Sequence, residues 1–170
     1  MIFQLSFSFS FKADEVIVLK YDELLIEADS NSLITKEKPL MAYDGRICGN
    51  KILIRSDMTE KEKTCVLAEE LGHHYTTVGN ILNQNKVENR KQEQQARTWA
   101  YNKLIGLMGI VDSYKAGCHN AHEMAEYLNV TEKFLIEALE RYRSKYGTYT
   151  TIDNYVIFFE PHLGVLEIQK

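Results

Sequence analysis

Apolar residues recur along the chain at two spacings, one typical of helices and the other of strands. Spacings of three and four residues indicate amphipathic helices, and alternation with polar residues indicates strands with one buried face. Near the beginning of the chain, Phe7, Phe9 and Phe11 alternate with Ser8 and Ser10 in this second manner. We expect helices at residues 21–28, 60–77, 87–108, 121–128 and 131–147. We expect extended segments at residues 3–11, 39–54, 155–159 and 165–168, so the pattern predicts an α+β fold.

Turn and capping residues refine these boundaries. Within residues 39–54, breaks at Asp44-Gly45 and at Gly49-Asn50 predict a small antiparallel sheet. Thr59 with Glu62 fits a capping box at the start of a helix, and Thr131 is a suitable N-cap for the last helix. The two final extended segments are separated by a loop that contains proline and glycine, which predicts a β-hairpin.

The composition is that of a globular protein. The chain has 170 residues, of which 45% are hydrophobic and 26% charged, with nine glycines and two prolines. These values exclude disordered and low-complexity classes, and the length suits one domain over residues 1–170. Residues 1–20 are expected to form an N-terminal extension whose role the sequence does not reveal. A net charge of −4 argues against general nucleic-acid affinity, which depends on an excess of Lys and Arg.

Neither membrane insertion nor disulfide bonding is indicated. No apolar run approaches the roughly 18 residues that a membrane-spanning helix needs. Three widely spaced cysteines without a CxxC pair are typical of reduced thiols. Residues 1–12 also lack the basic start and the small-residue cleavage site of a signal peptide. We therefore expect a cytoplasmic protein.

The helix expected at residues 60–77 carries the most informative side chains. Glu69 and His73 are four residues apart and share one helical stripe, with Glu70 about 100° away from Glu69. A carboxylate and an imidazole at this spacing can bind one metal ion. The spacing also arises often by chance, so an acidic stripe beside a core histidine is the alternative.

The next helix contributes a further acid. Glu93 shares a stripe with Ala96, Ala100 and Leu104, and this stripe should face the core. A buried carboxylate is costly unless a cation or hydrogen-bond donors compensate its charge. A metal held jointly with the preceding helix would supply that compensation. The alternative is a first-turn glutamate near a helix N-terminus, where negative charge is favourable.

The segments LAEELGHHYTTVGNI and NRKQEQQARTWAYNKLI resemble the ImmA/IrrE family of metallo-endopeptidases, which occur in bacterial mobile elements and prophages. The family pattern is an HExxH helix followed by a helix bearing ExxAxxxA, whose glutamate is the third zinc ligand. The resemblance covers roughly residues 45–110. It implies a zincin-like minimal metalloprotease fold, with a small antiparallel sheet packed on a helical bundle. It also implies Glu70 as general base and His73 and Glu93 as metal ligands.

The chain departs from the family pattern at the first ligand, where Glu69 stands in place of histidine. Carboxylate is a legitimate zinc ligand, so the expected set is Glu69, His73 and Glu93 around Zn²⁺. The additional negative charge shifts the preference towards harder divalent cations and reduces the acidity of the attacking water.

The resemblance implies a zinc-dependent endopeptidase whose partner is a repressor protein. Its substrate would be a helix-turn-helix repressor of the same prophage or mobile element, which the enzyme would cleave as an anti-repressor. The alternative is a degenerate, non-catalytic member that acts as a protein-binding regulatory module. The oligomeric state is not indicated by the sequence.

Two further patterns were weighed against this site. Glu70 and His74 are also four residues apart, but that register places Leu71 at the base position; His74 is expected to be a hydrogen-bonded core histidine. Residues 119–147 resemble a helix-turn-helix. Its second helix carries Glu132 and Glu137 where a DNA-reading helix would place basic residues, so a role in stability or substrate docking is favoured over DNA binding.

Overall fold

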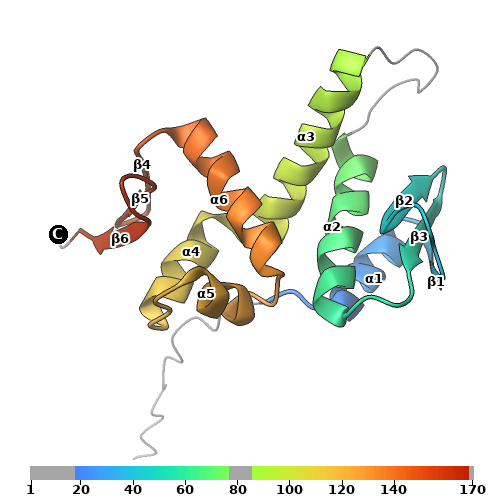
Figure 1. Cartoon of the computed structure of the whole chain (residues 1–170), viewed down its shortest axis with the longest axis horizontal. Helices are drawn as coiled ribbons and strands as arrows, with labels where there is room; N and C mark the ends of the chain where they lie inside the picture. Colours follow the sequence, from blue (N-terminus) through green and yellow to red (C-terminus); the bar gives the residue numbers. More distant parts are fainter. Residues whose placement is uncertain (1–17, 77–85, 169–170) are drawn as a thin grey trace, which may run out of the picture.

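The computed structural model describes the backbone of residues 18–76 and 86–168, and the side chains of all of these except 86–89. The extended segment predicted at residues 3–11 lies outside this part of the chain. The described ranges contain six helices and two three-stranded sheets, so the predicted α+β class is confirmed. The two sheets lie at opposite ends of the molecule, with the helices between them (Figure 1).

The first sheet is mixed, whereas an antiparallel sheet was predicted. β2 pairs antiparallel with β3, but β1 pairs parallel with β3 on its other side. The hairpin turn is at Gly49, which has a φ of 60°, and not at Asp44-Gly45. β1 was not predicted because it is largely polar and exposed and shows no apolar alternation. The elements of this half are α1 (Tyr21–Ser30), β1 (Ile34–Lys38), β2 (Gly45–Cys48), β3 (Lys51–Arg55) and α2 (Glu60–Thr76).

The helix predicted over residues 87–108 is two helices. Gly106 has a φ of 60°, a left-handed conformation that ends one helix and lets the chain start another in a new direction. The two helices are α3 (Lys86–Leu104) and α4 (Gly106–Lys115).

The last part of the chain forms a helical pair and the second sheet. Thr131 caps its helix as predicted, since its side chain accepts a hydrogen bond from the backbone N–H of Phe134. The predicted hairpin is confirmed, and a further strand that was not predicted pairs with its first strand. These elements are α5 (Ala121–Tyr127), α6 (Glu132–Tyr146), β4 (Tyr149–Ile152), β5 (Tyr155–Phe158) and β6 (Gly164–Glu167).

The core is centred on the crossing of α2 and α3. Leu67 and Leu71 are fully buried on α2, and Ala96 and Ala100 are fully buried on α3. The helices approach so closely that a Cβ added at Gly72 would lie only 2.3 Å from the carbonyl oxygen of Ala96. Small residues on both helices therefore set their separation. Over the described ranges, no helix has the length and apolar character required to cross a membrane.

Candidate functional site

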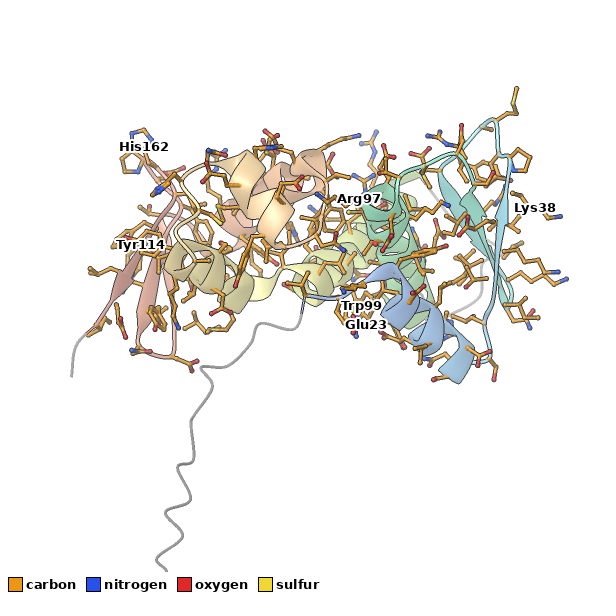
Figure 2. The ribbon with its side chains drawn as sticks, turned by 90° about the horizontal axis from the view of Figure 1, so that it is seen from below. Glu23, Lys38, Arg97, Trp99, Tyr114 and His162 are labelled. Carbon is orange, nitrogen blue, oxygen red and sulfur yellow. The ribbon has the colours of Figure 1, made fainter. Side chains whose placement is uncertain are left out.

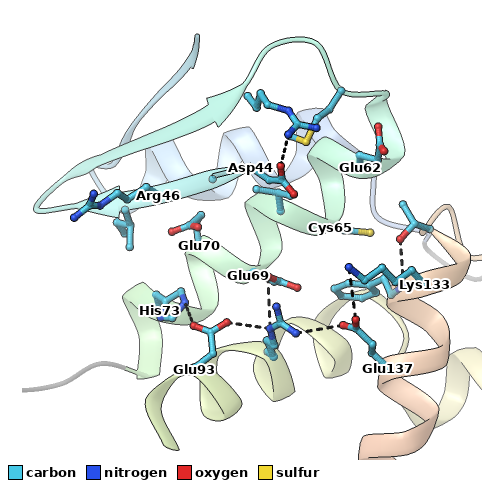
Figure 3. A pocket seen from close by; sticks show the side chains of 18 residues that line it. Asp44, Arg46, Glu62, Cys65, Glu69, Glu70, His73, Glu93, Lys133 and Glu137 are labelled. Atoms are coloured by element: carbon cyan, nitrogen blue, oxygen red, sulfur yellow. Dashed lines mark hydrogen bonds and ion pairs between the residues drawn. The ribbon is translucent and has the colours of Figure 1, made fainter. Parts of the chain in front are cut away.

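A pocket of about 640 Å³ opens where β2, α2, α3 and α6 meet. Its polar wall brings together most of the acidic side chains singled out above, together with cations from the neighbouring helices (Figure 3). The helical period of α2 directs its polar residues into this pocket while its leucines face the core. The ionisable lining residues of the three helices include Glu69, Glu70, His73, Glu93, Arg97, Lys133 and Glu137.

His73 and Glu93 face each other across the α2–α3 crossing. The His73 Nε2 lies 3.2 Å from the Glu93 Oε2. Two donor atoms each about 2.0–2.2 Å from one tetrahedral ion are separated by about 3.3–3.6 Å, so this pair lies close to the separation of two ligands of a single cation. The Glu93 side chain is 49% exposed, which corrects the expectation that it would be buried in the core. It lies at the rim of the helix crossing because the buried alanines of its stripe begin one turn further along α3.

Glu69 lies on the same wall but is directed towards a different partner. Its Oε2 is 3.9 Å from the Nε of Arg97. Burial raises the pKa of the Glu69 carboxyl to about 6, and the nearby Arg97 charge partly offsets that increase. No group of three His, Cys, Asp or Glu side chains converges as a metal site within the described residues. The structure thus pairs two of the three predicted ligands and places the third beside a guanidinium.

Glu70 is buried on the neighbouring face of α2, against strand β2. Glu70 is only 8% exposed, and this burial raises the pKa of its carboxyl to about 7. A hydrogen bond from the backbone N–H of Ile47 lowers the pKa and so partly offsets the effect of burial. β2 can lie this close because Gly45 has no side chain: a Cβ there would be 2.3 Å from Val66 and 3.0 Å from the Glu70 Oε1. A carboxyl that titrates near neutrality can accept and return a proton, as a general base requires.

Residues 26–140 match the family model of the IrrE N-terminal-like domain, peptidase family M78. The chain belongs to this family. The resemblance found in the two helices is therefore confirmed, and the matched range contains every pocket residue discussed here. Membership gives the chain a metallopeptidase-like character, because M78 peptidases are generally metal-dependent. Comparison with curated proteins found no match, and comparison with solved structures found none either.

The donor chemistry of this M78 site fits a divalent cation. An imidazole nitrogen and a carboxylate oxygen already stand at the separation of two ligands, and a second carboxylate lies on the same wall of the pocket. Zinc accepts both donor types, and an oxygen-rich set also suits harder ions. His73, Glu93 and Glu69 are the side chains that could hold the ion.

Two residues of the candidate site, Arg97 and Glu137, were not predicted from the sequence. The Arg97 Nε lies 3.0 Å from the Glu93 Oε1, and its Nη1 lies 3.4 Å from the Glu137 Oε2. The i,i+4 spacing of Glu93 and Arg97 was a usable signal for the first of these pairs. The second pair joins α3 to α6 and required knowledge of the tertiary structure.

The histidine beside the site differs from its expected environment. His74 is exposed, with its ring in edge contact with Tyr75 at 5.2 Å between centroids. The expectation of a hydrogen-bonded core histidine was therefore wrong. Its position near the end of α2 carries it past the core that buries Leu67 and Leu71.

Proposed function

We propose that this M78 protein is a metal-dependent endopeptidase whose catalytic centre is the pocket between α2, α3 and β2. The observation that carries the proposal is the 3.2 Å separation of the His73 Nε2 and the Glu93 Oε2, with the buried Glu70 on the adjacent face of α2. His73, Glu93 and Glu69 would hold Zn²⁺ or another divalent cation. When bound, such a cation polarises the scissile carbonyl and increases the acidity of the attacking water.

Glu70 acts as the general base in this proposal. The carboxylate takes a proton from the attacking water and then returns it to the leaving amine, so one side chain serves both halves of the reaction. Its location between α2 and strand β2 shields it from bulk water.

The substrate chain would lie along β2. This strand is at the edge of its sheet, with β3 as its only neighbour in the described strand order, and residues 45–47 line the pocket. An extended peptide can pair with the backbone groups of such an edge. A carbonyl in that peptide would pass close to Glu70, which packs against the same strand.

The family resemblance suggests a helix-turn-helix repressor of the same prophage or mobile element as the substrate, cleaved in the cytoplasm. Membership in the M78 family supports a peptidase role, and the sequence supports the repressor only through that resemblance.

The proposal is tested with the purified protein and two substitutions. We expect stoichiometric binding of Zn²⁺ or Mn²⁺ that is lost in Glu93→Ala, measured by metal analysis after dialysis. We expect a repressor encoded beside the gene to be cleaved by the wild type, and the rate to fall by at least about a hundredfold in Glu70→Gln, which keeps the cation. Equal cleavage by wild type and Glu70→Gln would contradict the assignment.

A non-catalytic, protein-binding module is the second candidate. It is favoured by the direction of the Glu69 carboxylate, which lies towards Arg97. This candidate predicts that the protein binds the repressor without cleaving it and that chelator does not alter the affinity. Binding measured with and without chelator separates the two functions.

A further inference from the structure

Glu93 uses its two carboxylate oxygens on two different partners. Its Oε2 faces His73 Nε2 at 3.2 Å, while its Oε1 is 3.0 Å from the Arg97 Nε (Figure 3). Arginine keeps its charge and presents its donors in a rigid planar fork. The bond to Oε1 therefore restricts rotation of the carboxylate and leaves the other oxygen directed at the imidazole.

Arg97 is itself held from α6. Its Nη1 lies 3.4 Å from the Glu137 Oε2, and the same oxygen accepts a hydrogen bond from the Tyr101 hydroxyl at 3.1 Å. Tyr101 is only 4% exposed, and its ring stands edge-on to Phe134 of α6 at 4.9 Å between centroids. The anchor of the guanidinium is thus fixed to the core, and Arg97 lies between α2 and α6 in the middle of the molecule (Figure 2).

A half-exposed glutamate needs such an anchor to act as a ligand. The Glu93 side chain is 49% exposed, and a free glutamate loses considerable rotamer freedom when it is fixed on an ion. An isolated surface ion pair would restrict it only weakly. Here the pair is part of a connected series of contacts that ends on a buried tyrosine, so the order is imposed before any cation binds.

The positive charge of Arg97 also repels a cation. This repulsion opposes the gain in cation affinity that comes from orienting Glu93. Three carboxylates surround the guanidinium, those of Glu69, Glu93 and Glu137. Their combined charge exceeds that of one arginine, so a divalent cation would still enter a net negative environment. We therefore expect the orienting effect to dominate.

We propose that Arg97, anchored by Glu137 and Tyr101, is a positioning residue that holds Glu93 in the orientation required of a metal ligand. The inference rests on the proposed function, because it assumes that Glu93 binds a cation. Outer partners that orient ligands typically contribute about 10–100-fold to metal affinity.

The test compares Zn²⁺ affinities, measured by competition with a chromophoric chelator, for the wild type and matched variants. We expect Arg97→Ala to weaken Zn²⁺ binding at least about tenfold. Arg97→Lys keeps the charge without the planar fork and should recover only part of that loss. The control is Arg141→Ala. It also removes an arginine that joins α6 to α3, through a 2.9 Å hydrogen bond to the Thr98 hydroxyl, but Arg141 does not line the pocket that holds His73 and Glu69. It should stay within about twofold of the wild type.

A further variant tests the anchor of Arg97 on α6. Tyr101→Phe keeps the buried ring and deletes only the hydroxyl that donates to Glu137. We expect a weakening of Zn²⁺ affinity of a few-fold, in the same direction as Arg97→Ala.

Unchanged or tighter Zn²⁺ binding in Arg97→Ala would overturn the inference, as would an equal loss in Arg141→Ala; the proposed function would stand in both cases provided that Glu93→Ala abolishes binding. Failure of the wild type itself to bind Zn²⁺ would overturn both the inference and the metal site.

Discussion

The consecutive glutamates Glu69 and Glu70 of α2 have different environments. Glu69 opens into the pocket beside Arg97, whereas Glu70 is buried against strand β2. Burial raises the pKa of Glu69 to about 6 and that of Glu70 to about 7. This difference is consistent with the separate roles proposed for them, cation binding by Glu69 and proton transfer by Glu70.

The stability of the metal-free protein should depend on pH through Glu70. Its pKa in the folded state is raised, so the stabilisation it gives is complete below the unfolded value of about 4.5 and is lost as the pH rises through about 7. Glu70→Gln removes this dependence. At pH 8 the metal-free variant should be more stable than the wild type by roughly 1–3 kcal/mol, and at pH 4 the two should nearly coincide. Urea denaturation in chelator at both pH values measures the difference.

Glu62 is a control because its pKa is shifted in the direction opposite to that of Glu70. Hydrogen bonds from the backbone N–H and the hydroxyl of Thr59 lower the pKa of the Glu62 carboxyl. Its stabilisation is present above the unfolded value and is lost as the pH falls, so Glu62→Gln should destabilise the protein at pH 8. A gain in stability in both variants at pH 8 would contradict the assignments.

At the scale of elements, the approach of α2 to α3 decides whether a site forms. Glu69 and His73 come from one helix and Glu93 from the other, so the proposed ligands can meet only if the helix axes are close. Gly72 permits this, because any Cβ there would collide with the backbone of Ala96.

Gly72→Ala should therefore separate the helices. Inserting a methyl group at a tightly packed crossing costs about 1–3 kcal/mol, and here the obstructing atom is backbone and cannot rotate away. We expect a loss of stability in this range and weaker Zn²⁺ binding, measured by denaturation and by metal titration. Gly164→Ala, where nothing lies within 4 Å of the added Cβ, is the control and should change neither. A variant with unchanged metal affinity would show that the crossing does not set the ligand separation.

Elements with a local sequence signal were predicted, and those that depend on distant parts of the chain were not. The capping box at Thr59 and the N-cap at Thr131 are local signals, and both helices begin where these residues indicate. β1 pairs parallel with β3. Its polar sequence shows no apolar alternation from which this pairing could have been predicted. The break at Gly106 was missed because the apolar spacing continues across it, while its left-handed φ becomes visible only in the structure.

Across the whole molecule, the site joins parts of the chain that are far apart in sequence. Pocket residues run from Asp44 to Glu137, all within the matched range 26–140, whereas β4, β5 and β6 lie beyond it. A ligand bound at such a junction stabilises the folded state as a whole, because the unfolded chain cannot assemble the donors.

Zn²⁺ should therefore raise the unfolding temperature of the full chain. At a concentration a hundredfold above the dissociation constant, the expected stabilisation is about 2.7 kcal/mol, measured by thermal denaturation with and without chelator. Glu93→Ala should lose this response. A chelator-insensitive unfolding temperature in the wild type would argue for the non-catalytic alternative.

The amino-acid pattern alone was sufficient to predict the side-chain directions on each helix and the family. The helical period placed Glu69 and His73 on one stripe of α2, and two short motifs identified the M78 relationship. Only the tertiary structure decided that Glu93 lies at an exposed rim and that Arg97 and Glu137 join it. The physical reason is that periodicity fixes the direction of a side chain relative to its own helix axis. Which neighbouring helix it meets depends on how the helices cross, and here small residues distant in the sequence set that crossing.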